Sequence, residues 1–241
     1  MKPNHPAPKP RGRRPSVEDF DVREHMLDTA THLFAERGIA ATTVAQIAGE
    51  AGVTSAMVHY YFTNREQLLD AVVDERLARV VDFVWRPVEP ETGGDPFAFA
   101  NELVERLFDV TARMPWLPPL WMREIVNEGG LLRERMLKRI PLEHVKRFAS
   151  HVQEAQQAGT VNPGLEPVYL FHSILALVML PLATSKIWQS ARGLPPFDRD
   201  MLRRHVRALL GSGMQVPGAS SARAAVKANT NSKASASRRK P

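Results

Sequence analysis

Apolar residues recur at intervals of three and four along nearly the whole of this chain, and this spacing constrains the fold more than any other feature. In an α-helix, such spacing places the apolar side chains on one face. No convincing alternation of apolar and polar residues between hairpin turns is present. The sequence therefore predicts an all-α protein of about nine or ten helices. In the first helix, expected from about Asp21 to Arg37, the stripe consists of Val22, Met26, Leu27, Ala30, Leu33 and Phe34.

Capping residues set the expected helix bounds. Gly38 follows the first helix in the position of a left-handed cap. The sequence Thr43-Val44-Ala45-Gln46 is a capping box at the start of a short second helix. Thr54 and Asn64 can cap a third and a fourth helix. Between Gly and Pro breakers, later helices are expected at about residues 96–113, 117–128, 131–139, 142–158, 167–189 and 197–210.

Charge is distributed unevenly along the chain. Residues 1–15 carry five Lys or Arg and residues 219–241 carry six, and neither segment has an acid. Removing these eleven from the 32 basic residues leaves 21 against 26 acidic ones, so the body of the chain is acidic although the net charge is +6. The first segment holds five prolines and the last is mostly Ala, Ser, Asn, Lys and Arg, so we expect both to be disordered. Basic arms of this kind can neutralise DNA phosphates.

Several protein classes are disfavoured. Because the chain has no cysteine, a disulfide framework and a Cys-ligated metal site are impossible. The start of the chain lacks the apolar core of a secretory signal, and the most apolar stretch, 168–183, is shorter than the roughly twenty residues of a membrane span. We therefore expect a cytoplasmic protein. No phosphate-binding Gly loop, His-Glu-x-x-His pair or nucleophile elbow is present, so we predict no catalytic residue, metal or cofactor.

Two short helices joined by a tight turn at Gly52 are the outline of a helix-turn-helix. Over about residues 20–70 the sequence closely resembles the DNA-binding domain of the tetracycline-repressor family, and from 71 to 218 it resembles that family only in helix order and length. The resemblance implies a three-helix DNA-binding domain (16–70) and a larger helical ligand-sensing and dimerisation domain (71–214). Composition adds a disordered basic arm (1–15) before them and a disordered basic tail (215–241) after them. The matching residues are Leu27-Asp28-Thr29-Ala30, Leu33-Phe34-Ala35-Glu36-Arg37-Gly38, Thr42-Thr43-Val44, Ile47-Ala48, Ala51-Gly52-Val53, Tyr60-Tyr61-Phe62 and Leu68-Leu69.

The resemblance implies that the third helix, from Thr54 to Tyr61, is the recognition helix. It also implies phosphate contacts from Thr43 and Arg65, at helix starts where free N–H groups suit an anion. The family commonly has Tyr where His59 stands and often Lys where Arg65 stands, so the base preference at His59 is open. Tyr61 has packing against the domain as an alternative role. The residues implied to face bases or phosphates from the recognition helix are Thr54, Ser55, Ala56, Met57, His59, Tyr60 and Tyr61.

Residues 16–65 hold three arginines against seven acids, so this domain by itself attracts a polyanion poorly. The arm Arg11-Gly12-Arg13-Arg14-Pro15 resembles the Arg-Gly-Arg-Pro core of minor-groove hooks, with one extra arginine. We hypothesise that Arg11, Arg13 and Arg14 bind DNA and supply much of the affinity. The alternative is a tail that only increases solubility.

The resemblance also implies a homodimer, expected through about 142–158 and 167–189. The second segment is apolar around much of its circumference, which a partner on more than one side would explain. The alternative is a central core helix in a monomer. Large adaptable side chains line apolar pockets, so an apolar or aromatic small-molecule effector is expected, although these residues can equally be plain core. The candidate effector contacts are Trp116, Trp121, Met122, Glu124, His172 and Met179.

We therefore predict a ligand-responsive transcriptional regulator, with repression as the expected mode. As a dimer it would read a near-palindromic operator in double-stranded DNA with recognition helices about 34–36 Å apart. The alternative is a family member that acts through protein partners with a silent helix-turn-helix. That alternative is kept open because residues 54–61 contain no Lys or Arg. Activation and repression differ only in where the operator lies relative to a promoter, which the sequence does not encode.

Overall fold

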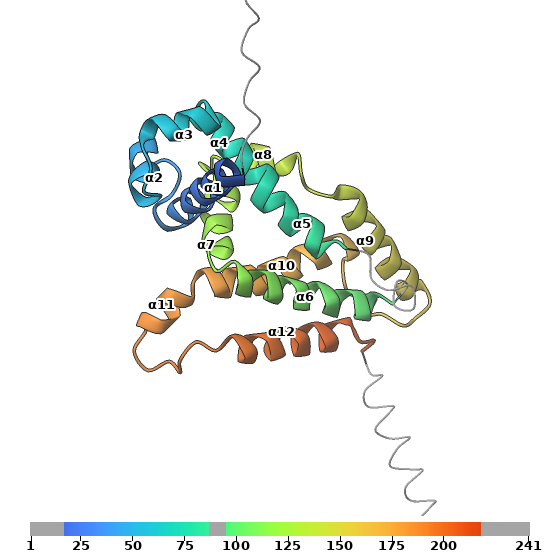
Figure 1. The fold of residues 1–241 in the computed structure, drawn as a ribbon. Coiled ribbons are helices and arrows are strands. Elements are labelled where there is room, and N and C mark those ends of the chain that lie inside the picture. Colours follow the sequence, from blue (N-terminus) through green and yellow to red (C-terminus); the bar gives the residue numbers. More distant parts are fainter. Residues whose placement is uncertain (1–16, 87–94, 218–241) are drawn as a thin grey trace, which may run out of the picture. The chain divides into compact units, whose positions relative to one another are not determined.

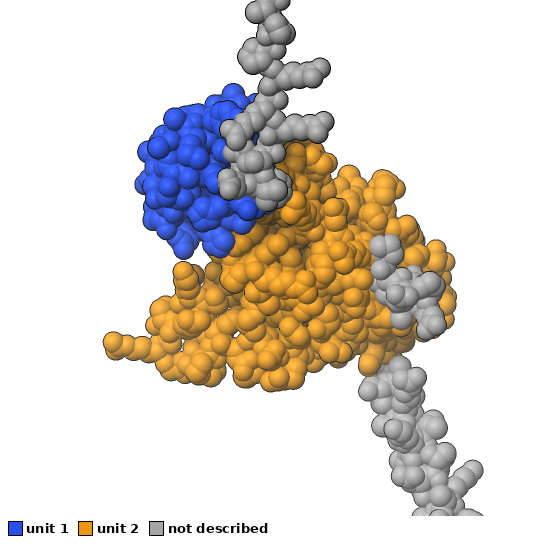
Figure 2. Space-filling view, in the orientation of Figure 1, with its two compact units in different colours: residues 1–72 blue, residues 73–241 orange. Residues whose placement is uncertain are grey.

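The computed structural model describes residues 17–86 and 95–217, and within those ranges it contains helices and no strand. The prediction of an all-α fold is confirmed. The chain divides into two compact units, residues 1–72 and residues 73–241 (Figure 2). Each unit buries its own set of apolar side chains.

The first unit contains α1 (Val17–Arg37), α2 (Val44–Glu50), α3 (Ser55–Phe62) and α4 (Arg65–Val72) (Figure 1). The stripe predicted for the first helix is largely buried, and Gly38 has φ 86°, as a left-handed cap requires. Burial of one such side chain stabilises a fold by roughly 1.5–3 kcal/mol. The core residues of this unit include Met26, Leu27, Leu33, Phe34, Ile47, Val58, Phe62, Leu68 and Leu69.

The second unit is built around α6, which packs against α5, α9, α10 and α12. Leu103, Leu107 and Phe108 of α6 are almost completely buried. The described elements of this unit are η1 (Val73–Leu77), α5 (Ala78–Val84), α6 (Pro96–Arg113), α7 (Leu117–Trp121), η2 (Met122–Val126), α8 (Arg133–Leu137), α9 (Leu142–Gln157), α10 (Pro167–Ala183), α11 (Ser185–Ser190) and α12 (Arg199–Met214), with η1 and η2 π-helical (Figure 1).

Two of the helices expected from the sequence are interrupted. The helix expected at 117–128 becomes π-helical from Met122, and the helix expected at 167–189 breaks at Thr184. Pro181 lacks an N–H and its ring crowds the carbonyl four residues earlier, which weakens the helix just before that break. At the break, the Leu180 carbonyl accepts both the Thr184 hydroxyl at 2.8 Å and the Thr184 backbone N–H at 3.0 Å.

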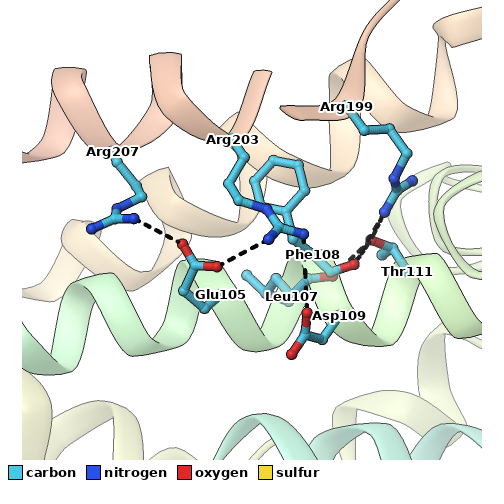
Figure 3. A network of polar contacts seen from close by, with 8 residues as sticks. All are labelled: Glu105, Leu107, Phe108, Asp109, Thr111, Arg199, Arg203 and Arg207. Carbon is cyan, nitrogen blue, oxygen red and sulfur yellow. Dashed lines mark hydrogen bonds and ion pairs between the residues drawn. The ribbon is translucent and has the colours of Figure 1, made fainter. Parts of the chain in front are cut away.

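Ion pairs fasten α12 to α6 (Figure 3). The Glu105 carboxylate lies 3.4 Å from the guanidinium of Arg203 and 3.5 Å from that of Arg207. Arg203 also lies 4.0 Å from Asp109, and its guanidinium stacks 5.3 Å above the Phe108 ring. A single exposed pair contributes little, but charges that share partners in a network hold a geometry more strongly.

Arg199, the first residue of α12, extends the same network. Its guanidinium donates to the Phe108 carbonyl at 3.1 Å and to the Thr111 hydroxyl at 2.9 Å. Burial, and then the nearby Arg203 charge, lower the pKa of Arg199 from its ordinary value, while Asp200 opposes this effect. The network therefore fixes which face of α12 turns toward α6.

Glycine is required where the chain folds back after η2. The Leu131 N–H donates to the Glu124 carboxylate at 3.2 Å, and the Leu132 N–H donates to the Glu124 carbonyl at 3.2 Å. A Cβ on Gly130 would lie only 2.2 Å from the Glu124 carbonyl oxygen, whereas a Cβ on Gly129 would meet nothing within 4 Å.

We predict that Gly130→Ala lowers the free energy of unfolding by about 1–3 kcal/mol, because backbone must move to relieve the clash. Gly129→Ala is the matched control and should change it by less than about 0.5 kcal/mol. Urea unfolding followed by circular dichroism measures both. Equal stability of the two variants would show that this close approach is absent in solution.

Candidate nucleic-acid interface

Side-chain caps position α2. The backbone N–H of Gln46 donates to the Thr43 hydroxyl at 3.2 Å, and the backbone N–H of Thr43 donates to the Gln46 side chain at 2.8 Å. Both halves of the predicted capping box are therefore present. The cap leaves Thr43 exposed at the N-terminal end of the helix.

A tight turn joins α2 to α3. Gly52 has φ 67°, a conformation that costs a side-chain-bearing residue roughly 1–2 kcal/mol. The Val53 N–H donates to the Ala48 carbonyl at 2.9 Å, and the Met57 N–H donates to the Thr54 hydroxyl at 3.3 Å. This geometry fixes the direction in which α3 leaves the turn.

Helix α3 has one buried face and one exposed face. Val58 and Phe62 are buried in the core, and the Arg23 guanidinium lies 5.1 Å above the Phe62 ring. Tyr60 is 80% exposed, which is far more than a side chain that packs within this unit would show. The exposed residues of this helix are Ser55, Ala56, Met57, His59 and Tyr60, all of them predicted DNA contacts.

Tyr61 and Arg65 are more enclosed than the other predicted contacts. The Tyr61 ring is half-buried and meets the Tyr60 ring edge-on at 5.1 Å. The Arg65 guanidinium donates to the backbone carbonyl of Ile39, so this side chain also fastens the start of α4 to the segment after α1. The Gln67 N–H donates to the Asn64 side chain at 2.9 Å, which is the fourth predicted cap.

The exposed face of α3 offers hydroxyl, imidazole and apolar groups but no permanent positive charge. Hydroxyls and imidazoles can bond to base edges, and apolar groups can contact thymine methyls. The three arginines of the predicted arm, Arg11, Arg13 and Arg14, lie outside the described residues.

The six predicted effector residues lie in the second unit, on or next to α7, η2 and α10. Met179 is buried and His172 is exposed, while Trp116 and Trp121 are half-buried. The buried Glu124 carboxylate accepts the Leu131 N–H described above.

Met122 alone of these six lines a groove of about 590 Å³ between η2 and the helix break at Thr184. The groove also presents the charged residues Arg123 and Glu128. Its full lining is Pro119, Met122, Arg123, Val126, Asn127, Glu128, Ala183 and Thr184.

The sequence analysis missed an aromatic cluster around Trp85. The Trp85 ring lies 4.6 Å from that of Phe171, 5.7 Å from that of His144 and 6.2 Å from that of Phe99. Phe99 in turn lies 5.0 Å from Phe148. Apart from His144 and Phe148, which lie one turn apart on α9, these residues are far apart in the sequence, so only the tertiary structure reveals the cluster.

Other kinds of site gain no support from the described part of the chain. Across residues 17–86 and 95–217, no three His, Asp or Glu side chains gather as metal ligands would. None of the helices in these ranges combines the length and the apolar character of a bilayer span.

Residues 26–72 match the family model for bacterial regulatory proteins of the tetR family. The regulator SrpR of Pseudomonas putida is 33% identical over 202 residues, which cover 83% of this chain and 87% of SrpR. TtgR of Pseudomonas putida is 33% identical over 97 residues, or 40% of this chain, and the match spans only 46% of TtgR. The structure of FadR from Bacillus subtilis in complex with stearoyl-CoA has a TM-score of 0.60 at 20% identity, covering 80% of this chain and 99% of FadR, and shares its fold.

We predict that Thr54→Ala lowers the free energy of unfolding by about 1 kcal/mol, because the Met57 N–H loses its side-chain acceptor and keeps only the Thr54 carbonyl. Ser55→Ala, one position inside the helix, is the control and should be neutral or slightly stabilising. Thermal unfolding of the purified variants tests this expectation. A Thr54→Ala protein as stable as the wild type would mean that the cap does not hold the start of α3.

Proposed function

This chain belongs to the tetR family of bacterial regulatory proteins, and we propose that it is a ligand-responsive transcriptional repressor that binds a DNA operator as a homodimer. The observation that carries this proposal is the capped α2–α3 pair, which exposes one face of α3 and buries the other. A short helix held in this way can enter the major groove.

In this proposal, Ser55 and His59 bond to base edges, while Ala56 and Met57 contact thymine methyls. Tyr60 donates its hydroxyl to a phosphate, which its 80% exposure allows. Thr43 and Thr54 lie at helix starts, where N–H groups can bind phosphate. Tyr61 and Arg65 touch the DNA backbone from more enclosed positions and also brace the unit.

The attraction to DNA comes mainly from outside this surface. Because α3 has no Lys or Arg and residues 16–65 carry four more acids than bases, the domain needs another source of positive charge. We propose that Arg11, Arg13 and Arg14 supply it by binding phosphates or the minor groove.

We propose an apolar effector that binds the second unit in the groove beside η2. Met122 and Val126 would contact the apolar part of the ligand, and Arg123 and Glu128 of the same groove would bind a polar group on it. A π-helical turn such as η2 often marks a functional site. FadR was solved with stearoyl-CoA, and we carry over to this chain only the apolar character of such a ligand.

The exposed surfaces favour a dimer through α10 and α12 over one that includes residues 142–158. Helix α9 buries Phe148 and Val152 and exposes mainly polar side chains, with Leu142 as its one exposed large apolar residue. Helices α10 and α12 expose several large apolar residues, which water solvates poorly. We therefore retain 167–189 in the proposed interface and replace 142–158 by α12. The large apolar residues exposed on α10 and α12 are Val168, Tyr169, Leu180, Met201 and Leu209.

Affinity selection of random duplex DNA by the full-length protein at physiological salt tests the proposal. We expect an enriched near-palindrome whose half-sites lie about one helical turn apart. His59→Ala should relax the preference at one base pair in each half-site, a loss of roughly 1–3 kcal/mol of discrimination. Glu50→Gln, on the exposed surface of α2, serves as a control that should leave the selected sequence unchanged.

If no sequence is enriched, the operator-binding proposal fails and the alternative of a protein partner gains support. The absence of Lys and Arg from α3 is the one feature that already points toward that alternative.

Binding to the selected operator weakens as salt rises, and deleting residues 1–15 should make the plot of log K against log salt less steep. Each phosphate contact that is lost lowers the magnitude of the slope by about 0.9. Deleting residues 219–241 removes six basic residues from the other end and provides the comparison. An unchanged slope in the protein that lacks residues 1–15 would show that the arm does not bind DNA.

A further inference from the structure

Helix α3 lacks every side chain that forms the two-bond contacts by which DNA-binding helices most often identify a base. Arg or Lys reads guanine, Asn or Gln reads adenine, and Asp or Glu accepts from the amino group of cytosine. None of these residue types occurs in residues 54–62. The exposed positions of the helix hold Ser55, Ala56, Met57, His59 and Tyr60 instead.

The amide and guanidinium groups nearest to α3 in the sequence are held by the fold. The side-chain oxygen of Gln46 accepts the Thr43 N–H at 2.8 Å and the Thr43 hydroxyl at 3.2 Å. The Asn64 side chain caps α4 by accepting a backbone N–H at 2.9 Å, and the Arg65 guanidinium donates to the Ile39 carbonyl. A two-bond contact between any of these groups and a base would therefore compete with the contacts that hold the unit together.

Small and apolar groups are what the first turn of α3 can bring to the major groove. The Ala56 side chain is a single exposed methyl group, and Met57 is 36% exposed and ends in an adaptable thioether. The first residues of a recognition helix are the ones that meet base edges. In the major groove, the apolar group that a base pair presents to them is the C5-methyl of thymine.

The polar residues on the same surface discriminate less between bases. Ser55 and His59 lie four residues apart, so they share one side of α3 next to Ala56. A hydroxyl bonds to a donor or to an acceptor, and an imidazole can do the same. Contacts of this kind tolerate several base pairs, so most of the discrimination has to come from the methyl contacts.

We propose that α3 recognises the C5-methyl groups of pyrimidines, and that thymine rather than guanine defines the core of each operator half-site. This inference rests on the proposed operator binding and names the class of DNA sequence that is selected. 5-Methylcytosine carries the same methyl group at the same ring position, so it belongs to the same class of ligand. Methylation of a cytosine that faces Ala56 or Met57 therefore strengthens binding.

Replacement of thymine by uracil tests this proposal, because it removes the methyl group and keeps the base pair and its O4 acceptor. The methyl group lies in the major groove. The minor-groove contacts proposed for Arg11, Arg13 and Arg14 therefore stay in place. Selection from random duplexes with the full-length protein supplies the operator, and fluorescence anisotropy at one fixed salt concentration measures the affinity for each substituted duplex.

The selected half-site should contain thymine, and replacing the contacted thymines one at a time by uracil should weaken binding about four-fold each, the factor that burial of one such group supplies. At the same positions, 5-methylcytosine should bind more tightly than cytosine by about the same factor. Equal affinity throughout either comparison overturns the proposal. A selected half-site whose core contains only G·C pairs also overturns it.

Variants of exposed residues test whether the effect belongs to α3. Met57→Ala should reduce the preference for thymine over uracil at one position of each half-site, and Ala56→Gly should reduce it at another. Tyr60→Phe is the matched control, because it removes only the hydroxyl proposed to bind phosphate and should weaken binding to both duplexes equally. A preference that is unchanged in both Met57→Ala and Ala56→Gly would contradict the assignment of the contact to α3.

Failure of this inference is distinguishable from failure of the proposed function. A palindrome that is enriched but binds equally well with thymine or uracil refutes the recognition of methyl groups alone. If no duplex is enriched, the proposed function and this inference both fail.

Discussion

The contacts that hold α12 against α6 determine which side chains of the second unit are exposed. Arg199, Arg203 and Arg207 recur every fourth residue, so all three point from one side of α12 toward α6 (Figure 3). Arg203 and Arg207 form ion pairs with Glu105, and Arg199 donates a hydrogen bond to the Phe108 carbonyl. With that side engaged, Met201 and Leu209 of α12 remain exposed. The ion pairs therefore determine which apolar residues of α12 face away from α6.

In the first unit, helix caps and a tight turn position α3. Its caps and turn fix the position of α3 without using any charged side chain on that helix. In the proposed function, the exposed face of α3 is therefore suited to distinguishing bases and poorly suited to attracting DNA from a distance. In the proposed function, specificity belongs to α3 and long-range attraction belongs to the basic arm.

Local signals in the sequence predicted the elements that caps and periodicity determine. The helix at 96–113 was predicted with the bounds that the structure has, because the breakers Gly93-Gly94 and Met114-Pro115 flank it in the sequence. The residues exposed on α3 were predicted from the resemblance to the family. Helix α5 was not foreseen, because its N-cap position is occupied by Leu77, which makes no side-chain cap. Pro181 is a local signal for the break at Thr184 that the sequence analysis did not use, whereas no local pattern marks the π-helical turn η2.

The effector residues were the least predictable part, for a physical reason. Large apolar side chains look alike in sequence whether they fill a core or line a groove. Of the six candidates, Met122 borders the groove beside η2, while Met179 is buried and His172 is exposed. The aromatic cluster around Trp85 joins three helices, α6, α9 and α10, to the residue that ends α5, so only the tertiary fold reveals it.

In the proposed function, two copies of this chain bind one operator together. The stoichiometry and affinity of the full-length protein on the selected palindrome, and on a duplex that carries only one half-site, test this. We expect two chains on each palindrome and much weaker binding to the half-site at the same salt concentration. One chain on the palindrome, with equal affinity for the half-site, would contradict it.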